Sequence, residues 1–324
     1  MITLAIDMMG GDLGSAELLK GVQNFDAAFP KRVHFILVGK KEELSGTPYE
    51  VVDARDVLPM NAGALDALRA KDSSMYRAVS LVNEGKAEAV VSCGATGAYL
   101  SASAVLLKKI PGVSRPALIT PFPTKIKGKK VTILDVGASN ENSAEEIAQF
   151  AMMGHLYSKV VLGIKEPKVY LLANGTEEGK GSPEGKEAAK LLAANSKLHY
   201  CGNIEARDAL MGEADVIATD GFSGNVLLKG DEGIAKIMSG MMKAAFKRNF
   251  FSKIGYLLAK KGFDDMAETM DYKNTGGALL IGVNGVVVKA HGNSDALAFY
   301  HALDVAAKLS EVDIVNKIKE GLAQ

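Results

Sequence analysis

The chain has 324 residues, and its 38 lysines and arginines are balanced by 38 aspartates and glutamates. This balance gives no indication of nucleic acid as a partner, and the two cysteines, Cys93 and Cys201, form neither a disulfide framework nor a metal-binding spacing. No apolar run reaches the roughly 18 residues of a membrane-spanning helix, and residue 2 enters an apolar strand without a basic leader. We therefore expect a protein of the reducing cytoplasm that is soluble or peripherally bound to a membrane.

Short apolar runs alternate with segments of helical periodicity along the chain. The predicted strands are residues 2–6, 34–38, 89–92, 117–120, 131–134, 169–172, 216–218 and 286–289. The predicted helices include residues 15–25, 75–83, 143–157 and 186–194. This alternation predicts an α/β fold with a mostly parallel sheet sandwiched by helices. The length suits a single α/β domain over residues 1–324, or two closely packed lobes.

Residues 215–229, DVIATDGFSGNVLLK, combine a strand end, a polar turn and a helix start. Residues 221–224 are predicted to form a tight turn, and the helix is predicted to begin near Asn225. Such a turn offers N–H groups and the positive end of a helix dipole to a phosphate or a developing oxyanion. Asp220, Ser223 and Asn225 lie at its edge. Alternatively, Asp220 and Asn225 only cap the turn.

Similar turns, rich in glycine and hydroxyl groups, occur elsewhere in the chain, most of them directly after predicted strands. They are residues 7–12 (DMMGGD), 92–97 (SCGATG), 135–140 (DVGASN), 175–182 (GTEEGKGS) and 289–292 (KAHG). The paired glycines at 10 and 11 allow backbone to approach a ligand closely. Because ligands bind outside the carboxyl ends of the strands in such sheets, we expect these turns to line one crevice.

Three common nucleotide and hydrolase motifs are absent. Residues 175–182 are one residue short of a P-loop and carry Gly181 where serine or threonine would bind magnesium. No G-x-G-x-x-G follows the first predicted strand, which disfavours a dinucleotide site. Ser223 is followed directly by Gly224, so there is no G-x-S-x-G elbow of a serine hydrolase.

Eight segments carry a resemblance to a known family. They are IDMMGGD, KDSSM, SCGATGA, RPAL, LDVGAS, GNIEARD, ADVIATDGFSGNVLLK and GVNGVVVKAHG. Their order and content resemble the bacterial phosphate acyltransferases of phospholipid synthesis, the PlsX family. The resemblance implies an isopropylmalate dehydrogenase-like fold, a homodimer, and conversion of acyl-acyl carrier protein and inorganic phosphate into acyl phosphate and free carrier. We expect no cofactor and no bound metal. Ala95, Ser139 and Ser182 stand where the family usually has asparagine.

The chemistry of that reaction suits polar turns without a serine triad. Inorganic phosphate, with a second pKa near ~6 to 7, is already ionised and nucleophilic at neutral pH. A leaving thiol with a pKa of ~8.5 needs little help from a general acid. The site must mainly hold an anion in line with a thioester and stabilise the oxyanion.

Four residues are predicted to be catalytic. Lys180 would hold the phosphate, with Ser73 and Ser74 as hydroxyl donors, although it could equally be a solvated loop lysine. His291 would protonate the thiolate or donate to the oxyanion, unless it is a structural histidine. Asp220 would orient His291 or Lys180, and Asn225 would serve the oxyanion. The other predicted substrate-binding residues are Asp7, Gly10, Gly11, Gly94, Thr96, Gly221 and Ser223.

Residues 233–263 are basic and amphipathic. They include seven lysines and arginines and no acidic residue, and Phe246, Phe250, Ile254, Leu257 and Leu258 recur at helical spacing. We expect residues 233–275 to form a protruding helical segment that is a dimer core, a docking face for an acidic carrier protein or a membrane-surface anchor. Peripheral membrane association in the family favours the third interpretation.

Two other functions stay open. A phosphotransacetylase-like enzyme that uses acyl-coenzyme A would share the fold and the chemistry. A non-catalytic membrane-associated protein would keep the basic segment and lose the crevice. A membrane glycerol-3-phosphate acyltransferase is a further expected partner of an enzyme that makes acyl phosphate.

Overall fold

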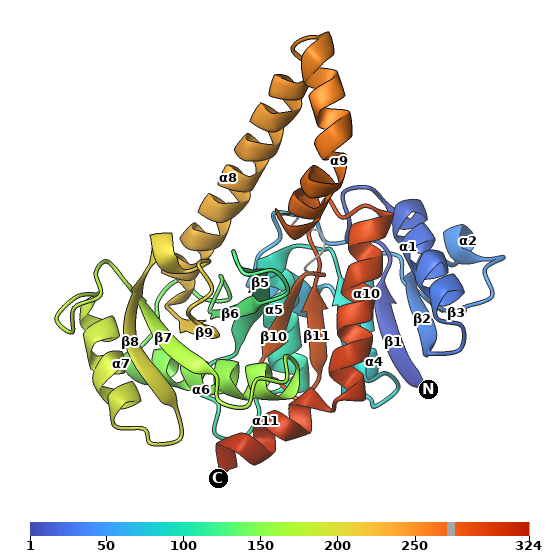
Figure 1. The fold of residues 1–324 in the computed structure, drawn as a ribbon. Helices are drawn as coiled ribbons and strands as arrows, with labels where there is room; N and C mark the ends of the chain where they lie inside the picture. The colour runs from blue at the N-terminus through green and yellow to red at the C-terminus, as the bar shows by residue number, and fades with distance from the viewer. Residues whose placement is uncertain (271–275, 324) are drawn as a thin grey trace.

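The computed structural model describes residues 1–270 and 276–323, with side chains described up to residue 263 in the first range. Within these residues there is one sheet of eleven strands, in the order β3-β2-β1-β4-β11-β10-β5-β6-β9-β7-β8 (Figure 1). The strands are β1 (Ile2–Asp7), β2 (Val33–Gly39), β3 (Glu50–Asp53), β4 (Ala89–Ser92), β5 (Ala117–Pro123), β6 (Lys130–Leu134), β7 (Lys168–Ala173), β8 (His199–Glu205), β9 (Val216–Ala218), β10 (Ala278–Ile281) and β11 (Val286–Lys289). The α-helices are α1 (Ser15–Ala28), α2 (Lys41–Leu44), α3 (Ala64–Arg69), α4 (Ser74–Asn83), α5 (Thr96–Leu107), α6 (Ala144–Val160), α7 (Pro183–Ala193), α8 (Gly221–Lys247), α9 (Phe250–Met270), α10 (Ala296–Glu311) and α11 (Ile314–Ala323).

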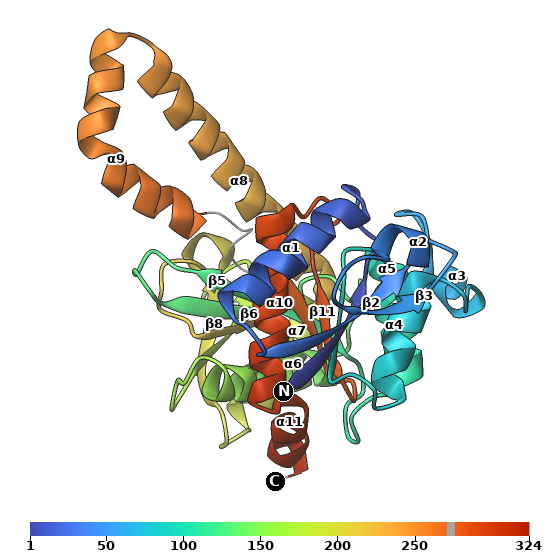
Figure 2. The same cartoon turned by 90° about the vertical axis from the view of Figure 1, so that its right-hand side faces the viewer.

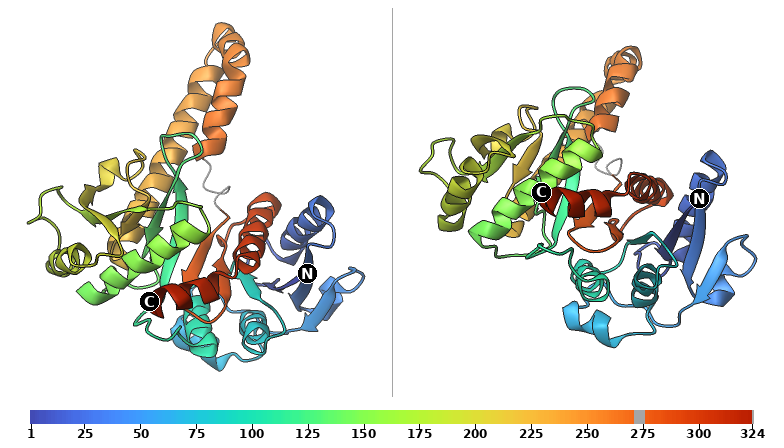
Figure 3. Two further views of the ribbon diagram at one scale, coloured as in Figure 1. Left: turned by 60° about the horizontal axis from the view of Figure 1, so that its bottom comes forward. Right: turned by 90° about the horizontal axis from the view of Figure 1, so that it is seen from below.

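The sheet consists of two parallel halves that run in opposite directions. β3, β2, β1, β4 and β11 form one half, and β6, β9, β7 and β8 form the other. β10 and β5 join them through antiparallel pairings. Figure 3 shows the blue N-terminal half and the green-to-yellow half on opposite sides of the molecule. The predicted α/β fold with a mostly parallel sheet is confirmed, and its description as one domain or two lobes stays a prediction.

Helices cover both faces of the sheet because the strands are apolar on both sides. Leu4 and Ile6 of β1 belong to the core beneath α1, α10, α11, α6 and α7. Ala5, which lies between them, belongs to the core on the opposite face, beneath α3, α4 and α5. This alternation with a period of two residues is the pattern of a strand buried on both faces. Figure 2 shows α1 and α10 side by side over the N-terminal half.

Three strands were not predicted from the sequence. β3 and β8 lie at the two edges of the sheet, and β8 carries His199, Gly202 and Asn203 in place of an apolar run. An edge strand needs fewer apolar residues because one of its sides is unpaired. β10 has only four residues, Ala278–Ile281.

α8 and α9 leave the body of the protein as a helical hairpin, which we call the α8–α9 hairpin (residues 234–270; Figure 1). Inside the hairpin, the ring centroid of Phe246 lies 4.5 Å from that of Phe263 and 5.3 Å from that of Tyr256. Large apolar side chains on its outer surface are more than half exposed, namely Ile234, Ile237, Met241, Phe250, Phe251, Leu257 and Leu258. The predicted protruding segment is therefore confirmed up to residue 270, and residues 271–275 of the predicted range lie outside the described residues. None of the helices described is both long and apolar enough to cross a membrane.

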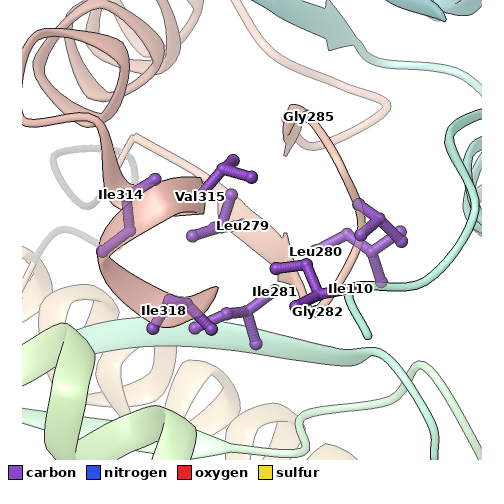
Figure 4. A pocket seen from close by; sticks show the side chains of 10 residues that line it. Ile110, Leu279, Leu280, Ile281, Gly282, Gly285, Ile314, Val315 and Ile318 are labelled. Atoms are coloured by element: carbon purple, nitrogen blue, oxygen red, sulfur yellow. The ribbon is translucent and has the colours of Figure 1, made fainter. Parts of the chain in front are cut away.

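A small apolar pocket lies between β10 and α11 (Figure 4), and α11 is at the end of the molecule away from the hairpin (Figure 1). Ile281 and Leu279 line it from the sheet, and Ile314 and Ile318 line it from α11. Since these side chains are hydrocarbon, the pocket offers no side-chain donor for an anion. It belongs to the core and not to the predicted crevice.

Candidate active site

The first polar cluster forms around Asp7, at the carboxyl end of β1. Asp7 is fully buried, and its carboxylate accepts hydrogen bonds from the hydroxyls of Ser74 and Ser92, both at 2.6 Å. Ser92 Oγ in turn accepts a hydrogen bond from the N–H of Gly94 at 3.0 Å. The structure thus brings together three predicted site residues, Asp7, Ser74 and Gly94, from three separate segments.

Glycines in this cluster allow two turns to pack on each other. A Cβ at Gly10 would lie 2.6 Å from Asp7 Oδ2 and 2.8 Å from the backbone nitrogen of Gly94. A Cβ at Gly11 would instead make a close but tolerable contact, 3.4 Å from that of Cys93. The sequence predicts that this pair allows backbone to approach a ligand closely, and this stays a prediction. The close contacts at Gly10 show that the fold itself requires a residue without a side chain at this position.

Ser73 and Ser74 both use their hydroxyls within the protein. Ser73 is fully buried and caps α4 by accepting a hydrogen bond from the N–H of Tyr76 at 3.3 Å. The hydroxyl of Ser74 donates a hydrogen bond to Asp7. A role as hydrogen-bond donor to the phosphate stays a prediction for both serines, and it requires their present hydrogen bonds to be exchanged for bonds to phosphate.

The turn after β11 joins the same cluster. The N–H of Asp12 donates to the carbonyl of Gly292 at 2.8 Å, which places His291 beside the first turn. Lys289 is 9% exposed, and its ammonium group donates to the carbonyls of Cys93, at 3.4 Å, and Ala290. Burial lowers the pKa of Lys289, because the charged form loses its hydration.

Lys289 was not among the predicted site residues. Two signals were present in the sequence: this lysine ends the apolar run VVVK, and it begins the predicted turn of residues 289–292. A buried lysine with a lowered pKa close to a histidine is a candidate for a functional site.

The second polar cluster forms around Asp135, directly after β6. Its carboxylate accepts hydrogen bonds from the N–H groups of Leu118, Gly137, Ala138 and Ser139, at 2.9 to 3.1 Å, and from Ser139 Oγ at 2.8 Å. Burial raises the pKa of Asp135, and these hydrogen bonds oppose the rise. Asp135 therefore fixes the turn of residues 135–140.

The start of α8 lies against this turn, and our prediction of its first residue was wrong. The helix begins at Gly221 rather than near Asn225, because Asp220 caps it by accepting a hydrogen bond from the N–H of Ser223 at 2.8 Å. A Cβ at Gly221 or Gly224 would overlap the backbone oxygens of Ser139 and Asp135, respectively. Gly221 and Gly224, which suggested a turn, thus lie in the first turn of a helix and allow it to pack closely on the neighbouring turn of residues 135–140.

Two N–H groups predicted to serve an oxyanion already have acceptors in the protein. The N–H of Gly221 donates to Asn142 Oδ1 at 3.0 Å, and that of Ser223 donates to Asp220. Asn225 is exposed one turn further along and packs beside Gly137, where a built Cβ would lie 3.2 Å from its side-chain carbon Cγ. The amide of Asn225 therefore stays a prediction for the oxyanion.

α8 connects the two clusters through one polar face. Asn225, Lys229 and Glu232 are spaced four and three residues apart, so they lie on the same side of the helix. Glu232 Oε2 lies 3.2 Å from the ammonium nitrogen of Lys229, and Glu232 Oε1 lies 3.8 Å from Nε2 of His291. The carboxylate beside His291 is thus Glu232, whereas we had predicted Asp220. Burial lowers the pKa of His291, and the charge of Glu232 opposes this.

Two predicted residues lie at the edge of this arrangement. Lys180 is exposed in the loop after β7, where its stem packs on Gly175, whose built Cβ would lie 2.8 Å from Lys180 Cγ. Among the described residues, no hydrogen bond or ion pair joins Lys180 to Asp220, so the predicted orientation of Lys180 by Asp220 lacks a contact. Thr96 is exposed at the first position of α5.

Ser182 and Ser139 stand where asparagine is usual in the resembled family, and both have structural partners. Ser182 caps α7 by accepting a hydrogen bond from the N–H of Gly185 at 3.0 Å. Ser139 donates to Asp135 and to Asn142.

The profile of one protein family, described as "fatty acid synthesis protein", matches residues 2–317. A phosphate acyltransferase of an Exiguobacterium species is 44% identical over 327 aligned residues, which cover 99% of both chains. Phosphate acyltransferases of Thermosipho melanesiensis and Lactococcus lactis are each 41% identical over at least 97% of both chains. The chain belongs to the phosphate acyltransferase (PlsX) family. The resemblance drawn from the sequence is confirmed.

Solved structures of other enzymes share the fold of this PlsX family member. A phosphotransacetylase of Streptococcus pyogenes superposes with a TM-score of 0.64 at 18% identity, over 96% of this chain and 94% of that chain. A 4-hydroxythreonine-4-phosphate dehydrogenase of Klebsiella pneumoniae superposes with a TM-score of 0.55 at 13% identity, over 96% of this chain and all of that chain. At such identities the likeness concerns the fold alone, and it confirms the predicted dehydrogenase-like architecture.

Proposed function

We propose that this protein transfers an acyl group from acyl-acyl carrier protein to inorganic phosphate, which yields acyl phosphate and free carrier for phospholipid synthesis. Membership in the phosphate acyltransferase family supports the reaction type. The observation that carries the assignment is the polar face of α8, which places Lys229 and Glu232 between the capped helix start and the turn of Lys289 and His291. That arrangement concentrates cations and hydrogen-bond donors, which are the groups that stabilise an anion.

The reaction needs a held nucleophile more than an activated one. A phosphate oxygen attacks the thioester carbon, the carbonyl oxygen becomes an oxyanion, and the carbon–sulfur bond then breaks. Lys229 and Lys289 both act electrostatically on His291, so we add them to Lys180 as candidate cations for phosphate. His291 is the candidate that protonates the departing sulfur.

Use of acyl-coenzyme A is the second candidate. The fold shared with phosphotransacetylase structures favours it, although the likeness is distant in sequence. The two thioesters differ in the group that carries the thiol, and an acidic carrier protein would be attracted by the basic α8–α9 hairpin.

The α8–α9 hairpin is proposed to contact a second copy of the chain and a membrane surface. Its exposed apolar side chains, among them Phe251 and Leu258 at 81% and 84%, form a surface that a monomer in water rarely leaves uncovered. The neighbouring lysines would strengthen binding to anionic lipid. A cytoplasmic enzyme held at the membrane would release acyl phosphate beside a membrane glycerol-3-phosphate acyltransferase, which we propose as the consumer of the product.

The reaction is tested by incubating the purified protein with long-chain acyl-acyl carrier protein and measuring free thiol with and without phosphate. We expect release of thiol only when phosphate is present, together with formation of acyl phosphate. Equal release without phosphate would show a thioesterase and overturn the proposal. A parallel assay with acyl-coenzyme A decides between the two thioesters.

A further inference from the structure

Glu232 is a charged residue that the sequence did not single out, and it lies in an unusual place. It sits in the middle of α8, and its side chain is 8% exposed. Its Oε1 atom is buried and lacks a hydrogen-bond partner. A buried carboxylate oxygen without a donor costs free energy, so its retention calls for a reason other than stability.

The group that Oε1 faces is the ring of His291. The distance from Oε1 to Nε2 is 3.8 Å, within range of an ion pair and longer than a hydrogen bond. The other oxygen, Oε2, is already engaged by Lys229 at 3.2 Å. Glu232 is therefore anchored on one side and directed at the imidazole on the other.

Several neighbours of His291 oppose a positive charge on its ring. Lys229 and Lys236 act on it from α8, and Lys289 acts on it from β11. Burial of the ring acts in the same sense. The charge of Glu232 favours the imidazolium form, and a second carboxylate, that of Asp12, lies on the turn that contacts Gly292.

We propose that Glu232 is a positioning residue that holds His291 through Nε2 and stabilises its protonated form while the ring moves a proton from phosphate to sulfur. The inference rests on the proposed function, because it assigns His291 its part in that reaction. It goes beyond that function by naming the group that makes His291 able to perform the transfer.

The proton balance of the reaction shows why such a relay is useful. Hydrogen phosphate forms the new carbon–oxygen bond, the carbon–sulfur bond breaks, and the product is an acyl phosphate dianion. The proton of hydrogen phosphate must therefore end on the thiol of the carrier. His291 can accept that proton from the phosphate hydroxyl and deliver it to the thiolate, and during the transfer it carries a positive charge beside Glu232.

The test compares Glu232→Gln with a matched control, Asp231→Asn. The control removes the carboxyl group of the preceding residue of α8, which projects about 100° away round the helix. The titration of the His291 ring is followed by NMR, with His291→Asn used to assign its signal. Since an opposite charge within a few ångströms moves a pKa by about 1 or more, we expect the pKa of His291 to fall by about 1 in Glu232→Gln and to stay unchanged in the control.

Kinetics on acyl-acyl carrier protein provide the second measurement. In Glu232→Gln we expect kcat to fall about tenfold, with its acidic limb displaced to lower pH by the same amount as the titration, and the KM for phosphate to change less than twofold. Glu232→Asp keeps the charge, so the pKa of His291 should return most of the way to its value in the unmodified protein. This result separates a positioning role from damage to the fold.

Two results would overturn the inference. One is an unchanged His291 titration in Glu232→Gln, and the other is an equal displacement in Asp231→Asn, which would mark a general effect of charge. The titration is independent of activity. Suppose that the pKa of His291 falls as expected in Glu232→Gln, but the protein shows no phosphate-dependent thiol release. This result would contradict the proposed function, while the pairing of Glu232 with His291 would stand.

Discussion

Three buried or half-buried carboxylates in this protein differ in how they are satisfied. Asp7 accepts two hydroxyl hydrogen bonds and one backbone hydrogen bond, and Asp135 accepts one hydroxyl and four backbone hydrogen bonds. Asp231, on α8, has a buried Oδ2 atom without a hydrogen-bond partner. Well-bonded carboxylates fix their turns, whereas Asp231 only bears the cost of lost hydration.

Asp231→Asn is expected to stabilise the protein near neutral pH. Burial raises the pKa of Asp231 to about 6, above the value of about 3.9 in the unfolded chain. The folded state thus binds more protons between these values, and the stability contributed by this group falls as pH rises from about 4 to 6. Because the side chain is half-buried and partly screened by water, we expect a gain of about 1 kcal/mol at pH 7.5.

Urea unfolding of both proteins at pH 4 and pH 7.5 measures this effect. The gain should be present at pH 7.5 and nearly vanish at pH 4. A difference of the same size at both pH values would show that Asp231 keeps an ordinary pKa.

Lys180→Ala tests whether the exposed lysine of the 175–182 loop binds phosphate. Loss of a charge-assisted contact is worth about 1.5 to 3 kcal/mol, so we expect kcat/KM for phosphate to fall roughly tenfold to a hundredfold. The control is Lys186→Ala, which changes an exposed lysine on α7. This variant should behave like the unmodified enzyme. Normal phosphate kinetics in Lys180→Ala would remove Lys180 from the site and favour Lys229 and Lys289.

At the scale of elements, α8 carries most of what is particular to this chain. Its first turn packs against the Asp135 turn, its third and fourth turns carry Lys229 and Glu232, and its remainder enters the hairpin. One continuous helix of 27 residues therefore links the candidate site to the exposed apolar surface. The helix was predictable in type, but its start was not, because the same glycines serve both tight turns and close helix packing.

Substitution of glycines in α8 separates these two uses. A Cβ at Gly230 or Gly233 would meet nothing within 4 Å, so Gly230→Ala and Gly233→Ala should each stabilise the protein by roughly 0.5 to 1 kcal/mol. Gly224→Ala should instead destabilise it by several kcal/mol, since its Cβ would overlap the backbone oxygen of Asp135 and lie 2.8 Å from Thr219 Cγ2. Thermal unfolding measures all three. Destabilisation by Gly230→Ala would indicate that another chain packs on that glycine in solution.

At the scale of the whole molecule, the hairpin stands apart from the sheet and its helices (Figures 1 and 2). The body is held by two apolar cores, one on each face of the sheet. The outer surface of the hairpin has no such cover within the described chain, since Phe250, Phe251 and Leu258 are each at least 71% exposed. Its interactions are therefore expected to be with other molecules.

The hairpin is tested by sedimentation with anionic liposomes. Replacing Lys253, Lys260 and Lys261 with glutamate should reduce binding, because each cation near an anionic surface contributes about 1 kcal/mol. High salt should have the same effect. A matched variant with glutamate at three exposed lysines of the body, Lys71, Lys186 and Lys197, should sediment almost normally, and catalysis on soluble carrier substrate should survive in both.

A further change, Leu257→Asp, distinguishes a membrane contact from a subunit contact. It should lower sedimentation further and leave dimers intact if the stripe meets lipid. Loss of dimers and of catalysis, with continued sedimentation of the folded protein, would show instead that the stripe is a subunit core.

The sequence by itself determined the alternation of strands and helices, the family and the protruding basic segment, because each depends on periodicity or on short runs of consecutive residues. The tertiary structure alone decided three features: the reversal between the two halves of the sheet, the edge strands, and the pairing of Glu232 with His291. Residues 232 and 291 are 59 positions apart, and they meet because α8 crosses from the end of β9 to the end of β11. Local patterns report which residues face a core, but they carry no record of which distant turns that core brings into contact.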